Sequence, residues 1–335
     1  MRTIPLAAAL ASAGLLTTPV LTSPVLTSSA WAHVVVGNRV FPVTLTLDDP
    51  GTADEASLPS FVYQRSVQDG GTGPTHNYNL GYEFDKTITP NTALILNGGY
   101  RIQQTNGSKT QTGFQNLYIT GKWQAYLNAP HELVVSVGVI RELGGTGTSH
   151  TGGDSHGATS PTLYFGKGLG DLPIGMLRPL AVTGELSYTI ADKELKVSPG
   201  QQPSGGSLIS APFINGLANQ SNNGNNNAWS GGVSLQYSLP YLQSQVRNIG
   251  LPGFLGDLIP LVEFTWSSPA STPSAQPTRW TAAPGVAYVA NWGQVGVEAL
   301  VPLNKAAGPN VGAVALVHFF FDDLFPTSIG KPIFP

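Results

Sequence analysis

The chain has 335 residues, of which only 10% are charged, and its formal net charge at pH 7 is −3. An ordinary soluble domain has roughly 25% charged residues, so this composition argues against a domain with a fully wetted surface. The sequence contains no cysteine, which excludes disulfides, thiolate catalysis and cysteine-ligated metals. A mild acidity without any basic run gives no indication of nucleic-acid binding.

Residues 1–32 have the features of a secretory signal peptide. Arg2 supplies a positive charge, residues 4–16 form an apolar stretch, and Ala30-Trp31-Ala32 is a small-x-small cleavage site. We therefore expect His33 to begin the exported chain. Prolines interrupt this leader, and no later stretch offers about 18 consecutive apolar residues, so no helical membrane anchor is expected.

Residues 33–59 precede the first repeat of alternating residues and carry an acidic cluster of Asp48, Asp49, Asp54 and Glu55. Such a cluster could bind a hard cation such as calcium, which takes six to eight oxygen ligands, but the spacing is not that of an EF-hand. An acidic turn exposed to the periplasm is the simpler interpretation, and we assign no metal or cofactor. A third interpretation applies if the following strands close into a barrel: the segment folds into its lumen as a plug.

From residue 60 onward, apolar and small polar residues alternate, which is typical of strands with two different environments on their faces. In residues 180–190, even positions are apolar or glycine, whereas odd positions are small or polar and include Glu185. Residues 228–239 show the same alternation. About twelve strands are expected, at 61–67, 77–86, 92–104, 113–127, 132–143, 158–168, 177–190, 227–239, 258–267, 279–289, 292–303 and 310–321.

The connections between these strands alternate between short turns and longer loops, of which 144–157 and 191–226 are examples. Outer-membrane barrels have short periplasmic turns and longer extracellular loops, and an even number of strands places both chain ends in the periplasm. Residues 240–257 are an exception on the short side, where a brief helix is expected at 241–248.

These features predict an all-β fold, a transmembrane, antiparallel, up-and-down β-barrel of about 12 strands at residues 60–322, followed by a periplasmic tail at 323–335. A soluble sandwich also alternates, but lysine and glutamate would cover its outer face, and here the apolar faces carry almost no charge. The expected location is the outer membrane, and the expected partners are its lipid and the barrel-assembly machinery.

Aromatic rings, which favour lipid headgroups, lie mostly near strand ends on the apolar face: Tyr78, Tyr82, Phe84, Tyr100, Trp123, Tyr188, Trp229, Tyr237, Trp266 and Trp280.

Charged residues in mid-strand are expected to face the lumen, because Arg or Lys facing lipid near the midplane costs about 2–4 kcal/mol. Arg141 and Arg178 have the opposite parity, but both lie near strand ends, where a long side chain reaches the interface. Two interpretations stay open: a mostly acidic solute pathway, or a network of paired charges that fills a narrow barrel. The inward set is Glu83, Arg101, Lys122, Glu142, Glu185, Glu263, Glu298 and His318.

The sequence offers weak candidates for a catalytic site and for metal sites in loops, and we expect neither. Asn219-Gln220-Ser221-Asn222 is similar to the motif of phospholipase A, a twelve-stranded outer-membrane hydrolase, but Asn219 stands where a histidine must activate the serine. We therefore expect no enzyme. His150, Asp154 and His156 offer zinc or copper ligands, but their glycine-rich loop does not preorganise them. His33 at a free N-terminus is a weaker candidate for copper.

Two stretches resemble a known group of proteins. Residues 114–123 (FQNLYITGKW) and 318–334 are similar to Gram-negative outer-membrane β-barrel transporters related to the family linked with meta-pathway phenol degradation, and residues 39–42 and 48–51 also fit that group. The resemblance covers most of the exported chain, and it describes a scaffold rather than a substrate. One departure is that about fourteen residues follow Phe321, whereas many barrels end on an aromatic strand residue.

The leader, the alternating strands and the inward charges together predict a channel or passive transporter for small molecules, with hydrophobic or aromatic compounds as the candidate solutes. The alternative is a closed structural or surface-display barrel whose loops 144–157 and 191–226 bind a partner. Twelve strands enclose a lumen between those of filled eight-stranded barrels and open sixteen-stranded porins, so the sequence leaves both possibilities open.

Overall fold

The computed structural model describes residues 34–66, 74–151, 153–194, 227–270 and 277–334. The expected signal peptide, His33, the motif at 219–222 and most of the loop 191–226 lie outside these ranges. Within them, none of the helices has the length and apolar character needed to cross a membrane.

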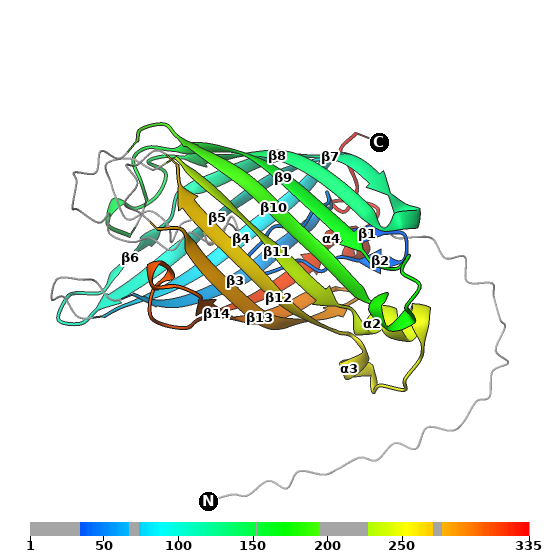
Figure 1. Ribbon diagram of the computed structural model, residues 1–335. Helices are drawn as coiled ribbons and strands as arrows, with labels where there is room; N and C mark the ends of the chain where they lie inside the picture. The colour runs from blue at the N-terminus through cyan, green and yellow to red at the C-terminus, as the bar shows by residue number, and fades with distance from the viewer. Residues whose placement is uncertain (1–33, 67–73, 152, 195–226, 271–276, 335) are drawn as a thin grey trace, which may run out of the picture.

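The described residues form one antiparallel sheet that closes on itself, so the predicted barrel is confirmed. β3 completes the circle, because it pairs with β4 on one side and with β15, at the other end of the chain, on the other. β6 and β7 are two segments of one crossing, so twelve crossings of described residues make up the wall (Figure 1). The strands are β3 (Glu55–Ser66), β4 (Thr75–Thr89), β5 (Thr92–Thr105), β6 (Gln111–Phe114), β7 (Leu117–Asn128), β8 (Leu133–Leu143), β9 (Ala158–Gly168), β10 (Leu180–Ala191), β11 (Ala228–Tyr237), β12 (Leu258–Pro269), β13 (Arg279–Ala290), β14 (Gly293–Pro302) and β15 (Gly312–Phe320).

Most predicted strands differ from the observed ones by a few residues at their ends, and two differences have clear causes. β3 begins at Glu55 rather than at Phe61. Pro59 lies inside a register shift of its pairing with β4, and a bulge accommodates a proline that cannot donate to the ladder. The crossing predicted at 113–127 is interrupted at Gln115 and Asn116, whose buried side chains make hydrogen bonds instead.

The two ends of the barrel differ in their connections. Short turns and the helices α2, α3 and α4 gather at the end where β1 and β2 also lie, whereas the loop residues 106–110, 144–151, 153–157 and 303–311 lie at the other end (Figure 1). By the rule for outer-membrane barrels, the first end is periplasmic and the second extracellular. The helices are η1 (Ala129–His131), η2 (Ser149–Thr151), η3 (Gly175–Leu177), α2 (Leu239–Tyr241), η4 (Leu242–Val246, a π-helix), α3 (Gly253–Gly256), η5 (Lys305–Ala307) and α4 (Phe321–Leu324). The brief helix expected near Tyr241 is therefore present.

The outer surface of the wall is apolar. In β10, Leu186 is exposed while Thr183, Glu185 and Ser187 are buried, as the alternation predicts. Such an outer surface can only be stable against lipid, and the protein is accordingly an outer-membrane β-barrel. Aromatic pairs on neighbouring strands lie near the extracellular strand ends, such as Trp266 with Trp280 at 6.2 Å between ring centroids. The exposed apolar side chains of the wall include Leu80, Leu94, Leu96, Val137, Val139, Leu163, Leu186, Val233, Leu235, Phe264, Val295 and Val297.

Candidate functional site

Residues 34–54, which we call the plug, occupy the interior of the barrel. They begin with a hairpin of β1 (Val35–Val36) and β2 (Arg39–Val40) at the periplasmic end (Figure 1), and nearly all of the following residues are buried. The acidic cluster is buried too, since Asp48, Asp49, Asp54 and Glu55 are at most 9% exposed. The interpretation of an exposed acidic turn is therefore wrong, because these carboxylates are buried inside the barrel.

Arg39 anchors the hairpin to three periplasmic connections. Its guanidinium donates to Glu132 in the turn between β7 and β8 at 3.1 Å, and to the carbonyl of Pro179 just before β10 at 2.9 Å. It also lies over the ring of Tyr241, 3.9 Å from the centroid. Because this side chain is buried, these contacts replace the water that it loses. The entry of the plug is thereby fixed to one side of the barrel.

The tip of the plug reaches the middle of the strands. A Cβ on Gly296 of β14 would lie 2.6 Å from Leu45, and a Cβ on Gly232 of β11 would lie 2.8 Å from Leu47. Wall glycines thus make room for plug side chains. Between these two leucines, the backbone N–H and the hydroxyl of Thr46 donate to Glu263 at 2.7 and 2.6 Å.

Lys122 of β7 is the cation at the centre of the contact between the plug and the barrel wall. Its Nζ lies 3.0 Å from Asp48 and 3.8 Å from Asp49, donates to the backbone carbonyl of Asp49 at 3.1 Å and lies 4.8 Å from the centroid of the Tyr164 ring. The backbone N–H of Asp48 donates to Glu185 on β10. The buried carboxylates of the plug are therefore held by a wall cation, while the plug backbone satisfies wall carboxylates.

One sector of the inner wall is apolar rather than acidic. Val43 and Leu45 of the plug form a buried cluster with wall residues of β3, β13, β14 and β15. The plug consequently has an apolar side and an acidic side, and so does the lumen that it fills. The wall residues of this cluster are Val62, Ala283, Leu300, Val314 and Leu316.

All eight residues predicted to face the lumen are buried, at no more than 6% exposed. Lys122, Glu185 and Glu263 contact the plug directly, as described above. Glu83 accepts from Asn97 at 3.1 Å and Glu142 from Asn116 at 2.8 Å. His318 Nε2 lies 3.1 Å from Glu55, and Glu298 lies buried beside Glu263.

Arg101 belongs to a separate layer on the extracellular side of Lys122. Its Nε donates to Asn79 at 2.9 Å, and Gln115 donates to the same oxygen at 2.9 Å. The two basic residues thus have different partners, although they lie on neighbouring crossings. Of the residues with opposite parity, Arg141 pairs with Asp192 at the extracellular end and Arg178 donates to Leu172 in a periplasmic turn.

Sequence reasoning missed several members of the site. Asp85 is buried and shares the parity of Glu83, so the alternation could have identified it. The amides Asn79, Gln115 and Asn116 carry no charge and gave no signal. Arg39 and its partners come from connections, where alternation assigns no side.

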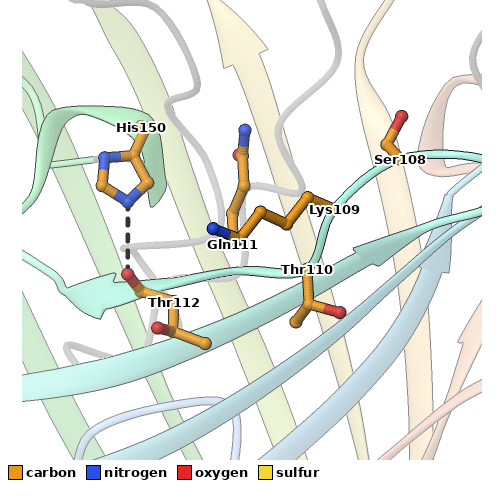
Figure 2. A pocket seen from close by; sticks show the side chains of 6 residues that line it. All are labelled: Ser108, Lys109, Thr110, Gln111, Thr112 and His150. Atoms are coloured by element: carbon orange, nitrogen blue, oxygen red, sulfur yellow. Dashed lines mark hydrogen bonds between the residues drawn. The ribbon is translucent and has the colours of Figure 1, made fainter.

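The extracellular rim carries a cleft of about 410 Å³. Figure 2 shows that His150 points toward the segment before β7, where its Nε2 lies 3.3 Å from the carbonyl oxygen of Thr112. His150, Asp154 and His156 do not converge on a common metal position in the described part of the loop. The cleft is lined by Ser108, Lys109, Thr110, Gln111, Thr112 and His150.

The chain folds back at its periplasmic end after β15. Phe334 donates its backbone N–H to Ile88 at the end of β4, and the N–H of Asp54 donates to the carboxylate of Asp322 at 3.1 Å. Burial, together with the nearby Asp54 carboxylate, raises the pKa of Asp322 to about 8. Lys86 pairs with Asp54 at the same place.

A scan against protein-family models finds no match, and no curated protein matches. Solved structures that are similar include an outer membrane channel from Pseudomonas putida F1, with 12% identity, a TM-score of 0.49, and coverage of 84% of this chain and 99% of that one. KdgM porin is 12% identical, with a TM-score of 0.39 over 78% of this chain and 98% of that one; it is also known in complex with disordered oligogalacturonate. The beta domain of the Bordetella autotransporter BrkA is 11% identical, with a TM-score of 0.43 over 80% and 99%. These likenesses are distant, and the fold is established by the closed strand pairing of this chain itself.

Proposed function

We propose that this protein is a channel or passive transporter for small solutes across the outer membrane, and that the plug controls passage. The observation that carries the proposal is the way in which the lumen is filled. The plug pairs only with itself as a two-stranded hairpin, and side-chain contacts hold it in the barrel. A barrel filled by its own wall side chains needs no such segment, whereas a removable segment leaves a passage behind.

Small hydrophobic or aromatic molecules are the solute class that we propose. The apolar sector of Val62, Leu300 and Leu316 offers a surface for a ring, and the carboxylates Glu185 and Glu263 on other strands offer acceptors for polar or cationic groups. A lumen with both surfaces favours amphipathic solutes over strongly hydrated anions, because buried carboxylates repel negative charge.

The full-length exported protein tests the proposal in planar bilayers and in liposomes loaded for swelling assays with a small sugar. We expect discrete conductance steps and swelling above the lipid background. Heat-modifiable migration on a gel verifies that the barrel is folded. Silence of the folded protein in both assays would exclude transport.

The solute class has its own test in the same bilayer. Benzylammonium and methylammonium carry the same single charge, so a difference between them in blocking the current reports the apolar sector. We expect block by benzylammonium at a concentration at least about tenfold lower, which corresponds to roughly 1.4 kcal/mol. Leu316→Ser should reduce this difference, and equal block by both cations in the wild type would argue against an aromatic solute.

A second candidate function is recognition of a partner at the cell surface, and the rim cleft favours it. In that case, cells that display the double variant Lys109→Ala with His150→Ala should no longer bind the partner. Solute flux should stay at the lipid background in the wild type and in the variant. Conductance by the wild type, together with unaltered partner binding by the double variant, would count against this function.

A further inference from the structure

Three carboxylates meet where the plug joins the wall. Asp49 comes from the plug, Glu55 from the start of β3 and Asp85 from β4, and one oxygen of each lies within 4.8 Å of the others. The three residues are only 4%, 3% and 7% exposed. Three ionised carboxylates at this separation and depth repel one another strongly, because little water screens them.

Asp85 is the member of this group with an unsatisfied oxygen atom. Its Oδ1 is buried and has no hydrogen-bond partner among the described residues. An ionised group buried without a partner is costly, and native structures rarely leave such an atom unexplained. A bound ion is one of the standard explanations.

The two neighbouring cations form direct ion pairs with other carboxylates, and Lys122 acts on Asp85 only at longer range. Lys122 lies 3.8 Å from Asp49 but is closer to Asp48, at 3.0 Å. His318 lies 3.1 Å from Glu55. The acidic groups around this junction also include Glu83, which adds charge near Asp85. The local balance is therefore strongly negative even when both bases are counted.

We propose that Asp49, Glu55 and Asp85 bind one hard divalent cation of the Ca²⁺ type. Carboxylate oxygens are the ligands that such cations prefer, and Ca²⁺ accepts irregular sets completed by water. Because the ligands come from the plug and from two wall strands, the cation fastens the plug to the barrel. This inference does not depend on transport, since it concerns binding of an ion to the resting structure.

Equilibrium dialysis with radioactive Ca²⁺ tests the site on the full-length protein, refolded in detergent from chelator-treated material in the presence of the ion. We expect one Ca²⁺ per folded chain. Asp85→Asn keeps the shape of the side chain and removes its charge, and it should weaken binding by at least about tenfold.

Glu298→Gln is the matched control, because Glu298 is also a buried lumen carboxylate, but it lies beside Glu263 rather than in this group. Its Ca²⁺ binding should equal that of the wild type. Absence of stoichiometric binding by the folded wild type would overturn the proposal and indicate that protons neutralise the group. Equal loss in both variants would overturn it as well, since the effect would then follow the overall lumen charge. If Asp85→Asn does not fold, Glu55→Gln replaces it.

Discussion

Lys122 holds the plug through contacts that no other described side chain duplicates. Two plug carboxylates lie within 4.0 Å of its ammonium, which is itself buried. Removing one member of a buried ion pair leaves the other charge without compensation and typically costs about 3–5 kcal/mol. The cost falls on the docked plug, because the released plug can hydrate Asp48 and Asp49.

Lys122→Met should therefore release the plug while the strand pairing stays intact. We expect faster amide hydrogen exchange in residues 41–51, with protection of the strands unchanged. Lys167→Met is the control, because its pair with Asp171 at 3.1 Å is partly exposed, and such pairs contribute about 0–1 kcal/mol. Wild-type protection of the plug in the Lys122 variant would assign its attachment to the backbone contacts with Glu185 and Glu263.

At the residue scale, alternation identified which side chains are buried but not what they touch. Parity alone predicts that the eight charged residues of the inward set face the lumen, and each of them is buried in the structure. The partners of Lys122 lie more than seventy positions earlier in the chain, in a segment without regular alternation. Contacts between a wall strand and an irregular segment leave no periodic signal, so the alternatives of pathway and charge network could not be separated from sequence.

At the element scale, the plug can be locked in place to ask whether it moves. The Cγ of Leu45, which is where a cysteine sulfur would sit, lies 3.4 Å from a Cβ built on Gly296. The chain has no cysteine of its own, so Leu45→Cys with Gly296→Cys introduces a single candidate disulfide, and its geometry is close to that required. Replacing Leu45 by the smaller cysteine also frees the space that the cysteine side chain introduced at position 296 needs.

Oxidation of this double variant should lower conductance at least about tenfold if solutes pass only when the plug is displaced, and a reductant should restore it. Leu45→Cys alone should respond to neither reagent. Unchanged current through the oxidised double variant, with the disulfide verified by mass spectrometry, would place the path between a fixed plug and the wall.

The periplasmic tail gives an element-scale prediction on pH. The pKa of Asp322 is about 8 in the docked tail and about 3.9 in an unfolded chain. Between about pH 4 and pH 8, the docked form therefore binds a proton that the released form does not. Its stabilisation is complete below about pH 4 and declines as the pH rises through 8. Partial exposure of this carboxylate and the neighbouring Lys86 reduce the size of the effect.

Hydrogen exchange of residues 321–334, corrected for the intrinsic effect of pH on exchange, should show weaker protection at pH 9 than at pH 5. In Asp322→Asn this dependence should be largely lost, because the amide does not titrate. A tail with the same protection at both values in the wild type would contradict the proton-linked docking.

The strand positions were predictable because each crossing repeats one pattern against two uniform environments. Exceptions appear where the pattern is broken for a local reason, such as Pro59 in β3 or Gln115 between β6 and β7. The tail and the plug hairpin follow no such repeat. Their positions depend on contacts with the finished barrel, such as that of Arg39 with Glu132.

For the whole molecule, closure into twelve crossings gives a lumen wide enough to hold a chain segment, and the plug occupies its periplasmic part. The extracellular part contains a second layer, in which Arg101 and Gln115 share an acceptor on Asn79. The plug and the Arg101 layer lie at different depths of the lumen, so we treat them as two candidate barriers in series, of which the narrower one sets the current.

Deleting residues 34–52 should separate these barriers. It removes the plug but keeps Asp54, which accepts from Thr87 at the barrel end. If the plug is the narrower barrier, conductance should rise several-fold and the pore should favour cations, because Glu83, Asp85, Glu185, Glu263 and Glu298 then outnumber Arg101 and Lys122 on the wall. The reversal potential in a KCl gradient measures this selectivity, and Arg101→Glu with Lys122→Glu in the deleted chain should increase it further. An unchanged conductance in a folded deletion variant would instead identify the Arg101 layer as the barrier, in which case Arg101→Ala combined with the deletion should open the pore.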